Sequence, residues 1–249
     1  MIDLDSEKIK RAVRGDLLYY ETLDSTNKEA LRHFEAPDKS LFLTKNQTAG
    51  RGRMGRRWEA SAGGIYMTVL LKPQEVKDIS ALTLVTGLAV AEVIQDAQIK
   101  WPNDIILNGK KVAGILLETK ITGKNGVIAV GIGINANNTE FSEEISDKAT
   151  SIFLQTGKRQ DETALVIGVY EKLLEIYERF LKGFDNIREE YVKKCIMLNR
   201  EITVITDSGS RRMFAVGIGK NGELIAEADG KQEAINFGDV SVRGILGYN

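Results

Sequence analysis

Apolar and polar residues follow two different periods along the chain, and together these periods predict a mixture of helices and strands. Helical spacing predicts five helices, at residues 1–16, 26–35, 78–97, 161–182 and 184–198. Short apolar runs predict strands at 41–45, 64–72, 99–101, 104–118 and 126–135, after a first apolar stretch at 17–20. The segment 78–97 is apolar on more than one face, as expected of a helix packed deeply against a sheet.

Local signals predict where some of these elements begin and turn. Ser6 precedes EKIKRAV as a helix cap, and Thr26 with Glu29 has the spacing of a capping box. Asn108-Gly109 is a strong hairpin signal inside the 104–118 segment.

The pattern changes after Asn199. Five short alternating segments follow, broken by the turn pairs Ser208-Gly209, Asn221-Gly222 and Asp229-Gly230. Short strands of this kind are typical of a small antiparallel barrel. We therefore expect a domain boundary near residue 199.

Residues 46–63 form a stretch rich in glycine and arginine that is too long to be a simple connection. Lys45 and four arginines, at 51, 53, 56 and 57, occur there without an acidic residue before Glu59. The glycines at 50, 52 and 55 satisfy G-x-G-x-x-G, but no helical pattern follows, so a dinucleotide site is a poor interpretation. Two interpretations remain equally open: binding of a phosphate chain, and a solvated basic loop with or without contact to nucleic acid. Trp58 ends the stretch, either as a stacking surface for a purine or as an anchor to the core.

A second cluster lies in KWPNDIILNGKKVAG, residues 100–114. Its polar residues suit a turn and a hairpin, yet Asp104 beside Asn103 also suits a magnesium ion whose other ligands are phosphate oxygens. Lys110 and Lys111 are adjacent on a predicted strand, so their side chains point to opposite faces and at most one enters a site.

Gly131 and Gly133 interrupt a strongly apolar strand that ends at Asn135. Glycine weakens a strand unless something approaches it closely. Core packing and a ligand lying against the strand explain the two glycines equally well.

Composition removes several reaction classes. The 249 residues carry 34 Lys and Arg against 35 Asp and Glu, a net charge of -1 that does not favour nucleic acid or anionic membranes as partners. His33 and Cys195 are the single histidine and cysteine, so a His/Cys zinc cluster and a disulfide framework are excluded. We expect His33 on a helix surface and Cys195 in the core. No apolar run approaches membrane-spanning length, and we expect a cytoplasmic protein.

The order of these motifs resembles that of the biotin protein ligase family, the biotin-[acetyl-CoA-carboxylase] ligases. The matching pieces are DSTN at 24–27, QTAGRGRMGRRW at 47–58, GGIYMTVLL at 63–71, KWPNDIILNGKKVAGILLE at 100–118 and VGIGIN at 130–135. The resemblance implies an α+β fold. A mixed-sheet catalytic domain similar to the class II aminoacyl-tRNA synthetase core would span 1–198, and a small SH3-like β-barrel would span 199–249.

The resemblance also implies a reaction. Biotin and ATP, with Mg²⁺, would give biotinyl-5′-AMP and pyrophosphate, and a lysine of a biotin carboxyl carrier protein domain would then accept the biotinyl group. A Gly/Arg loop, a lysine and Mg²⁺ would neutralise the phosphate charge without any histidine.

Carried over position by position, the resemblance assigns roles to individual residues. The residues expected to bind biotin are Ser25, Thr26, Asn27, Gln47, Arg51, Gly52, Arg53 and Lys111. Those expected to bind ATP or the adenylate are Arg51, Arg53, Trp58, Asn103, Asn135 and Arg243. Lys111, Arg53 and Arg51 are the expected catalytic groups, and Asp104 is the expected metal ligand.

Two features separate this chain from relatives with other roles. The 23 residues before Asp24 leave no room for the helix-turn-helix domain with which many members repress transcription, so we expect no operator binding. A homodimer is an expectation from the family alone. The closest alternative is a lipoate or octanoate ligase, whose RRxSGGG element this chain replaces with GRGRMGRRW and KWPND. A nucleic-acid-binding regulator is the alternative from another class, and it predicts salt-dependent affinity for DNA.

Overall fold

The computed structural model describes residues 4–74, 79–122, 125–206, 209–236 and 241–244. Its larger sheet has seven strands in the order β1-β2-β3-β7-β6-β5-β4. They are β1 (Leu17–Leu23), β2 (Ser40–Gln47), β3 (Gly64–Leu71), β7 (Asn125–Asn135), β6 (Lys110–Thr122), β5 (Asp104–Leu107) and β4 (Gln98–Lys100). Strands β1 and β2 are parallel and every other neighbouring pair is antiparallel, so the sheet is mixed.

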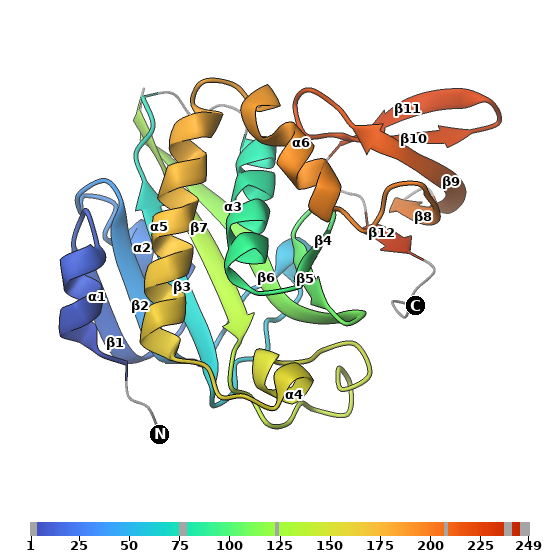
Figure 1. Ribbon diagram of the computed structural model, residues 1–249. Helices are drawn as coiled ribbons and strands as arrows, with labels where there is room; N and C mark the ends of the chain where they lie inside the picture. The colour runs from blue at the N-terminus through green and yellow to red at the C-terminus, as the bar shows by residue number, and fades with distance from the viewer. Residues whose placement is uncertain (1–3, 75–78, 123–124, 207–208, 237–240, 245–249) are drawn as a thin grey trace.

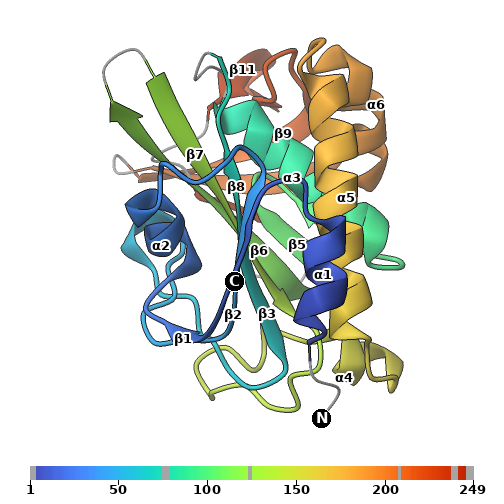
Figure 2. The same cartoon turned by 90° about the vertical axis from the view of Figure 1, so that its left-hand side faces the viewer.

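Helices cover the two faces of this sheet unequally (Figures 1 and 2). One face carries α1 (Ser6–Ala12), α3 (Ile79–Val93), α5 (Glu162–Phe180) and α6 (Asp185–Lys194). The other face carries α2 (Thr26–Arg32), which packs over a small apolar cluster that contains Ala30 and Phe42. Much of the second face is therefore left for a site, and the short helix α4 (Ile152–Thr156) lies near one end of the sheet.

Helix α3 lies in the centre of the larger core. Its residues 81–91 are all buried, which explains why the sequence is apolar on more than one side of the helix. It contacts α5, and both helices pack on the inner side chains of the central strands, such as Ile115 and Ile132.

The C-terminal strands form a second, fully antiparallel sheet (Figure 1). Its order is β11-β10-β9-β8-β12, with β8 (Arg200–Thr206), β9 (Gly209–Ile218), β10 (Leu224–Ala228), β11 (Lys231–Ile235) and β12 (Ser241–Gly244). The α+β class is thus confirmed. Closure of this sheet into an SH3-like barrel, and the domain division at 198/199, stay predictions. Trp101 links the two sheets, because its indole Nε1 donates a 3.0 Å hydrogen bond to the Gly222 carbonyl.

The predicted hairpin is confirmed. Asn108 and Gly109 have φ angles of 50° and 80° between β5 and β6, as a tight two-residue turn requires. The turn residue Ser208 lies outside the described residues.

Both predicted caps are wrong. Asp5, rather than Ser6, caps α1 by accepting from the Lys8 amide. The N-cap of α2 is Ser25, without a side-chain cap, while Thr26 lies inside the helix and Glu29 pairs with Arg32. Thr26 instead bonds to residues of the sheet, so tertiary hydrogen bonds replace the local capping pattern.

No helix in the described ranges is long and apolar enough to cross a membrane.

Candidate active site

A cavity of about 330 Å³ lies on the face of the sheet that most helices leave uncovered. Its cationic lining residues are Arg51, Arg53, Arg56, Arg57, Lys100, Lys111 and Lys148. Asp104 is the one carboxylate residue in the described lining. Such an excess of positive charge favours a ligand with several negative charges.

Glycines form the floor of this cavity. Gly131 lies beside Thr68 of β3 and Leu116 of β6, and Gly133 lies beside Gly114 of β6. A Cβ on Gly131 would collide with the amide of Asn27. The missing side chain at Gly131 therefore makes room for a protein side chain, which favours packing over a ligand as the explanation of this glycine.

Trp58 packs over the neighbouring pair of glycines, Gly114 and Gly133. A Cβ on either Gly114 or Gly133 would lie 2.7 Å from the indole. The Lys111 ammonium lies 5.3 Å from the ring centroid, within the range of a cation–π contact. The buried indole Nε1 has no hydrogen-bond partner in the described protein. The cavity thus has one end near Asn27, beside Gly131, and another where Trp58 and Lys111 lie beside Gly114.

The end near Asn27 is lined mainly by neutral polar groups. Thr68 Oγ1 lies 2.7 Å from Asn27 Oδ1 and 2.8 Å from Thr26 Oγ1. Because an amide oxygen only accepts, the Thr68 hydroxyl donates to Asn27. The Thr26 backbone amide donates to Gln47 Oε1 at 2.8 Å, which fixes the orientation of that side chain.

Two groups at this end keep unused hydrogen-bonding capacity. Gln47 uses its oxygen for Thr26, so its NH₂ group is available toward the cavity that it lines. Ser25 is 2% exposed, lines the same cavity and uses its backbone amide for Asp24. No side-chain bond of the Ser25 hydroxyl occurs among the described residues. A small neutral polar ligand group fits these two partners.

The arginine-rich stretch folds into a tight loop that leads into Trp58. The Gly52 amide donates to the Arg56 carbonyl at 2.8 Å, and the Trp58 amide donates to the Gly50 carbonyl at 3.0 Å. A 3₁₀ turn (Arg53–Gly55) forms its tip, in which Met54 has a φ of 55°. No helix follows, which agrees with the rejection of a dinucleotide fingerprint.

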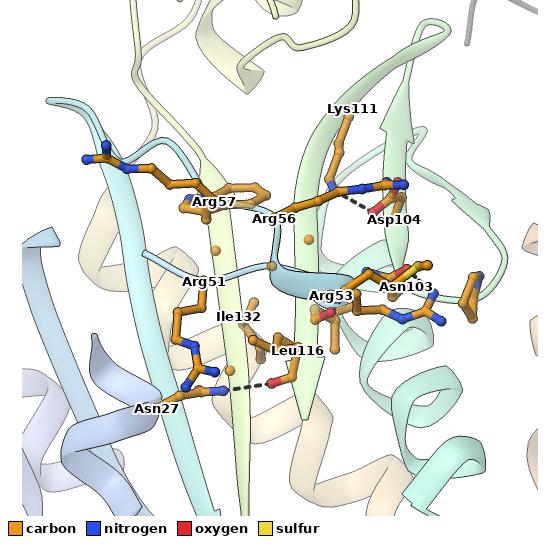
Figure 3. A pocket seen from close by; sticks show the side chains of 18 of the residues that line it. Asn27, Arg51, Arg53, Arg56, Arg57, Asn103, Asp104, Lys111, Leu116 and Ile132 are labelled. Carbon is orange, nitrogen blue, oxygen red and sulfur yellow. Dashed lines mark hydrogen bonds and ion pairs between the residues drawn. The ribbon is translucent and has the colours of Figure 1, made fainter. Parts of the chain in front are cut away.

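The four arginines of this loop diverge (Figure 3). Arg51 reaches toward Asn27, whereas Arg53 and Arg56 extend toward Asn103 and Asp104. Arg57 points away from them and donates to the Thr48 carbonyl at 3.2 Å. The loop therefore supplies positive charge to both ends of the cavity.

Arg53 is half-buried, whereas the other three arginines of the loop are exposed. Its Nη1 donates to Asn103 Oδ1 at 3.2 Å, and Asn103 in turn donates from Nδ2 to the Ile115 carbonyl at 3.1 Å. Burial lowers the pKa of the Arg53 guanidinium, an effect that the charge of Asp104 opposes. A partly desolvated guanidinium held in this way suits recognition of phosphate oxygens.

Lys111 and Asp104 lie at the far end of the cavity. Lys111 Nζ is 2.5 Å from Asp104 Oδ1. Lys110 points elsewhere and donates to the Ser146 carbonyl at 3.0 Å. As the strand period predicts, only one of the two adjacent lysines enters the site.

One expected nucleotide contact, Asn135, is not brought into this group, and the position of another, the Arg243 side chain, stays a prediction. Asn135 is buried at the end of β7, donates to the Thr150 carbonyl at 3.0 Å and is absent from the cavity lining. Arg243 lies on β12, and its side chain is outside the described residues. All other expected site residues line the cavity.

Sequence reasoning missed three residues of this region. Thr68 is the one polar residue in the buried strand β3, a signal that could have drawn attention to it. Glu118 directly follows the apolar residues of β6, and it contacts both Arg51 and Asn27. Lys148 lines the cavity from a loop, and nothing in the local pattern predicts this.

His33 and Cys195 lie outside the cavity lining. His33 follows α2 with its side chain 43% exposed, and Cys195 is buried. Both positions agree with the expected roles.

Comparison with known proteins places this site in a family. Residues 19–135 match the model of the "Biotin/lipoate A/B protein ligase family", and residues 197–243 match the "Biotin protein ligase C terminal domain". Among solved structures, the biotin protein ligase from Aquifex aeolicus in complex with biotin and ATP is similar with a TM-score of 0.83 and 31% identity. That match covers 92% of this chain and 99% of the other.

Two curated relatives agree. The biotin–[acetyl-CoA-carboxylase] ligase of Paracoccus denitrificans is 33% identical over 89% of this chain and 98% of its own length. The bifunctional ligase/repressor BirA of Bacillus subtilis is 32% identical over 94% of this chain and 76% of its own length. The fold and the cavity define an acyl-protein ligase of the biotin/lipoate class. Within that class, the chain belongs to the biotin protein ligase family.

Proposed function

We propose that this biotin protein ligase works in two steps within the one cavity. In the first step a biotin carboxylate oxygen attacks the α-phosphorus of ATP, so that biotinyl-5′-AMP forms and pyrophosphate leaves. In the second step the neutral amine of a carrier-protein lysine attacks the acyl carbon. An amide bond forms, AMP leaves and the amine gives up a proton. Neither step requires a histidine.

The difference between the two ends of the cavity carries this proposal. Ser25 and Gln47 on one side offer unused partners for the ureido group of biotin, which needs several hydrogen bonds once desolvated. Lys111, Arg53 and Arg56 on the other side offer positive charge to a triphosphate. The biotin carboxylate and the α-phosphate would meet beside the indole, where Lys111 can stabilise the charge that develops.

Adenine would stack on Trp58, on the face of the indole that does not pack against Gly114 and Gly133. Asn103, which Arg53 and the Ile115 carbonyl hold in place, offers an amide edge to the base. The role of Arg243 toward the phosphates is proposed from the resemblance alone. Asn135 would act indirectly, because its amide holds the segment that carries Lys148.

A magnesium ion would bind at Asp104. The described residues contain no group of three or more His, Cys, Asp or Glu side chains that could hold a metal, and a single carboxylate suits an ion whose other ligands are phosphate oxygens and water. Such an ion would neutralise phosphate charge during adenylation. Asp104 would hold the ion, and Lys111, which lies beside it, would contact the reacting groups.

ATP–pyrophosphate exchange tests this function. Purified protein is assayed with biotin, with lipoate, with octanoate or with no acid, each with and without Mg²⁺. We expect exchange with biotin and Mg²⁺ only. Exchange with lipoate or octanoate would assign the substrate of the sister family, and no exchange under any condition would refute the adenylation step. Transfer is then tested with a biotin carboxyl carrier protein domain and its lysine-to-arginine variant.

A further inference from the structure

The carboxylate of Glu118 joins two parts of the site that are far apart in sequence. Its Oε1 lies 2.8 Å from Arg51 Nη1 at the base of the arginine loop. Its Oε2 accepts a 2.9 Å hydrogen bond from Asn27 Nδ2 at the start of α2. One side chain thus contacts both the arginine loop and α2.

The position of Glu118 on β6 explains why it can do this. Side chains alternate along the strand, so Ile115 and Leu117 pack in the larger core on the helical face, while Gly114, Leu116 and Glu118 point to the cavity face. Glu118 is 19% exposed, compared with 48% for the Arg51 side chain. An ion pair that is partly shielded from water keeps more of its Coulomb energy than one on the open surface.

Asn27 is fully engaged inside the protein. Its Nδ2 donates to the Leu116 carbonyl at 3.0 Å as well as to Glu118, and its Oδ1 accepts from Thr68. These partners fix the orientation of the amide, because two acceptors surround Nδ2. Asn27 therefore has no donor left for a ligand, and its place in the DSTN motif serves to hold Glu118.

From these contacts we propose that Glu118 is a positioning residue, which holds Arg51 over the biotin end of the cavity and ties the arginine loop to α2. The inference rests on the proposed function and adds a residue to it. Arg51 is one of four arginines on a strongly cationic loop, so without a carboxylate at its base the like charges repel and the guanidinium loses its fixed direction. Glu118 supplies that carboxylate without lining the cavity itself.

The test combines Glu118→Gln with Arg51→Gln in a double-mutant cycle. Glutamine keeps the size of Glu118 and an acceptor for Asn27 but removes the charge that holds Arg51. We expect Glu118→Gln to raise KM for biotin about tenfold, with kcat changed less than about twofold, because a hydrogen-bonded charge pair is lost outside the reacting groups. In the Arg51→Gln background the same change should have no further effect, because Glu118 acts through Arg51.

A second readout is independent of biotin chemistry. Trypsin cleaves after arginine, so the rate of cleavage within 51–57 in the unliganded protein reports how firmly the loop base is held. Glu118→Gln should accelerate this cleavage several-fold. Glu190→Gln is the matched control, since it breaks a 2.5 Å pair with Arg179 between α5 and α6 and should alter neither readout.

The outcomes separate the two proposals. Failure of wild-type exchange with biotin would remove the proposed function while leaving the cleavage comparison valid. Multiplicative effects of the two substitutions on KM, or cleavage of Glu118→Gln at the wild-type rate, would overturn the positioning role. A fall in kcat with unchanged KM would also overturn it.

Discussion

The Lys111 ammonium lies 2.5 Å from the Asp104 carboxylate, although Asp104 pairs in register with Gly114, three residues further along β6. The lysine side chain reaches diagonally across the hairpin to make this contact. The charge of Lys111 is therefore balanced within the protein. A bound phosphate would compete with Asp104 for this lysine.

Lys111→Ala should reduce biotin-dependent ATP–pyrophosphate exchange by about 100-fold or more, because it removes a preorganised charge beside the reacting groups. Lys110→Ala is the matched control. Its ammonium contacts the Ser146 carbonyl outside the cavity lining, and exchange should stay near the wild-type rate. Equal rates for the two variants would remove Lys111 from the reaction.

Arg53→Ala should also reduce exchange strongly, with much of the effect in KM for ATP, since Arg53 and Asn103 form one unit at the nucleotide end. Arg14→Ala removes an exposed arginine that pairs with Glu178, away from the cavity, and serves as the control. The measurement is initial rate against ATP concentration at saturating biotin. An unchanged KM and kcat for Arg53→Ala would contradict the assignment.

Gly133→Ala should displace Trp58, because the new Cβ would lie 2.7 Å from the indole in a well-packed floor. We expect KM for ATP to rise on the order of tenfold, since overpacking of this kind typically costs 1–3 kcal/mol. Tryptophan fluorescence should shift in parallel. Gly217→Ala adds the same methyl where nothing lies within 4 Å, so both signals should remain at wild-type values there.

Cys195 predicts a pH dependence. Burial raises the pKa of its thiol from 9.0 to about 11, so the folded protein binds this proton more tightly than the unfolded chain. The stabilising contribution is complete below pH 9 and is lost as the pH rises toward 11. The stability difference between wild type and Cys195→Ala should therefore shrink over that interval in urea titrations. Iodoacetamide should alkylate Cys195 slowly at pH 8.5 unless the protein is unfolded, and fast reaction of the native protein would refute the burial argument.

The sequence predicts the fold where one pattern dominates. The 81–91 segment of α3 is apolar on all sides because it is enclosed on all sides, and Asn108-Gly109 specifies its turn by backbone conformation alone. The caps fail for a physical reason. Thr26 could bond locally to its own helix, but its neighbours in space, Thr68 and Gln47, compete successfully for it.

The same limit applies to the site. Motifs along the chain locate Lys111, Arg53 and Trp58, because each belongs to a local run with an unusual composition. They do not reveal that Gly131 faces Asn27, or that Glu118 faces Arg51, since the first pair lies more than one hundred residues apart along the chain and the second more than sixty. Spatial pairs of this kind depend on the strand order of the sheet, which no short motif encodes.

The bond between Trp101 and Gly222 bears on attempts to reuse the catalytic part of this chain. Trp101 is 1% exposed and lies two residues before Asn103. Its contact with Gly222 therefore packs the C-terminal sheet against the segment that carries the proposed nucleotide contacts. A fragment ending near residue 198 would keep every cavity-lining side chain identified above and yet expose this indole to water. We therefore expect the larger sheet and its helices to be unsuitable for transfer into another protein on their own. An engineered or fused ligase based on it has to carry its small C-terminal partner along as structural support.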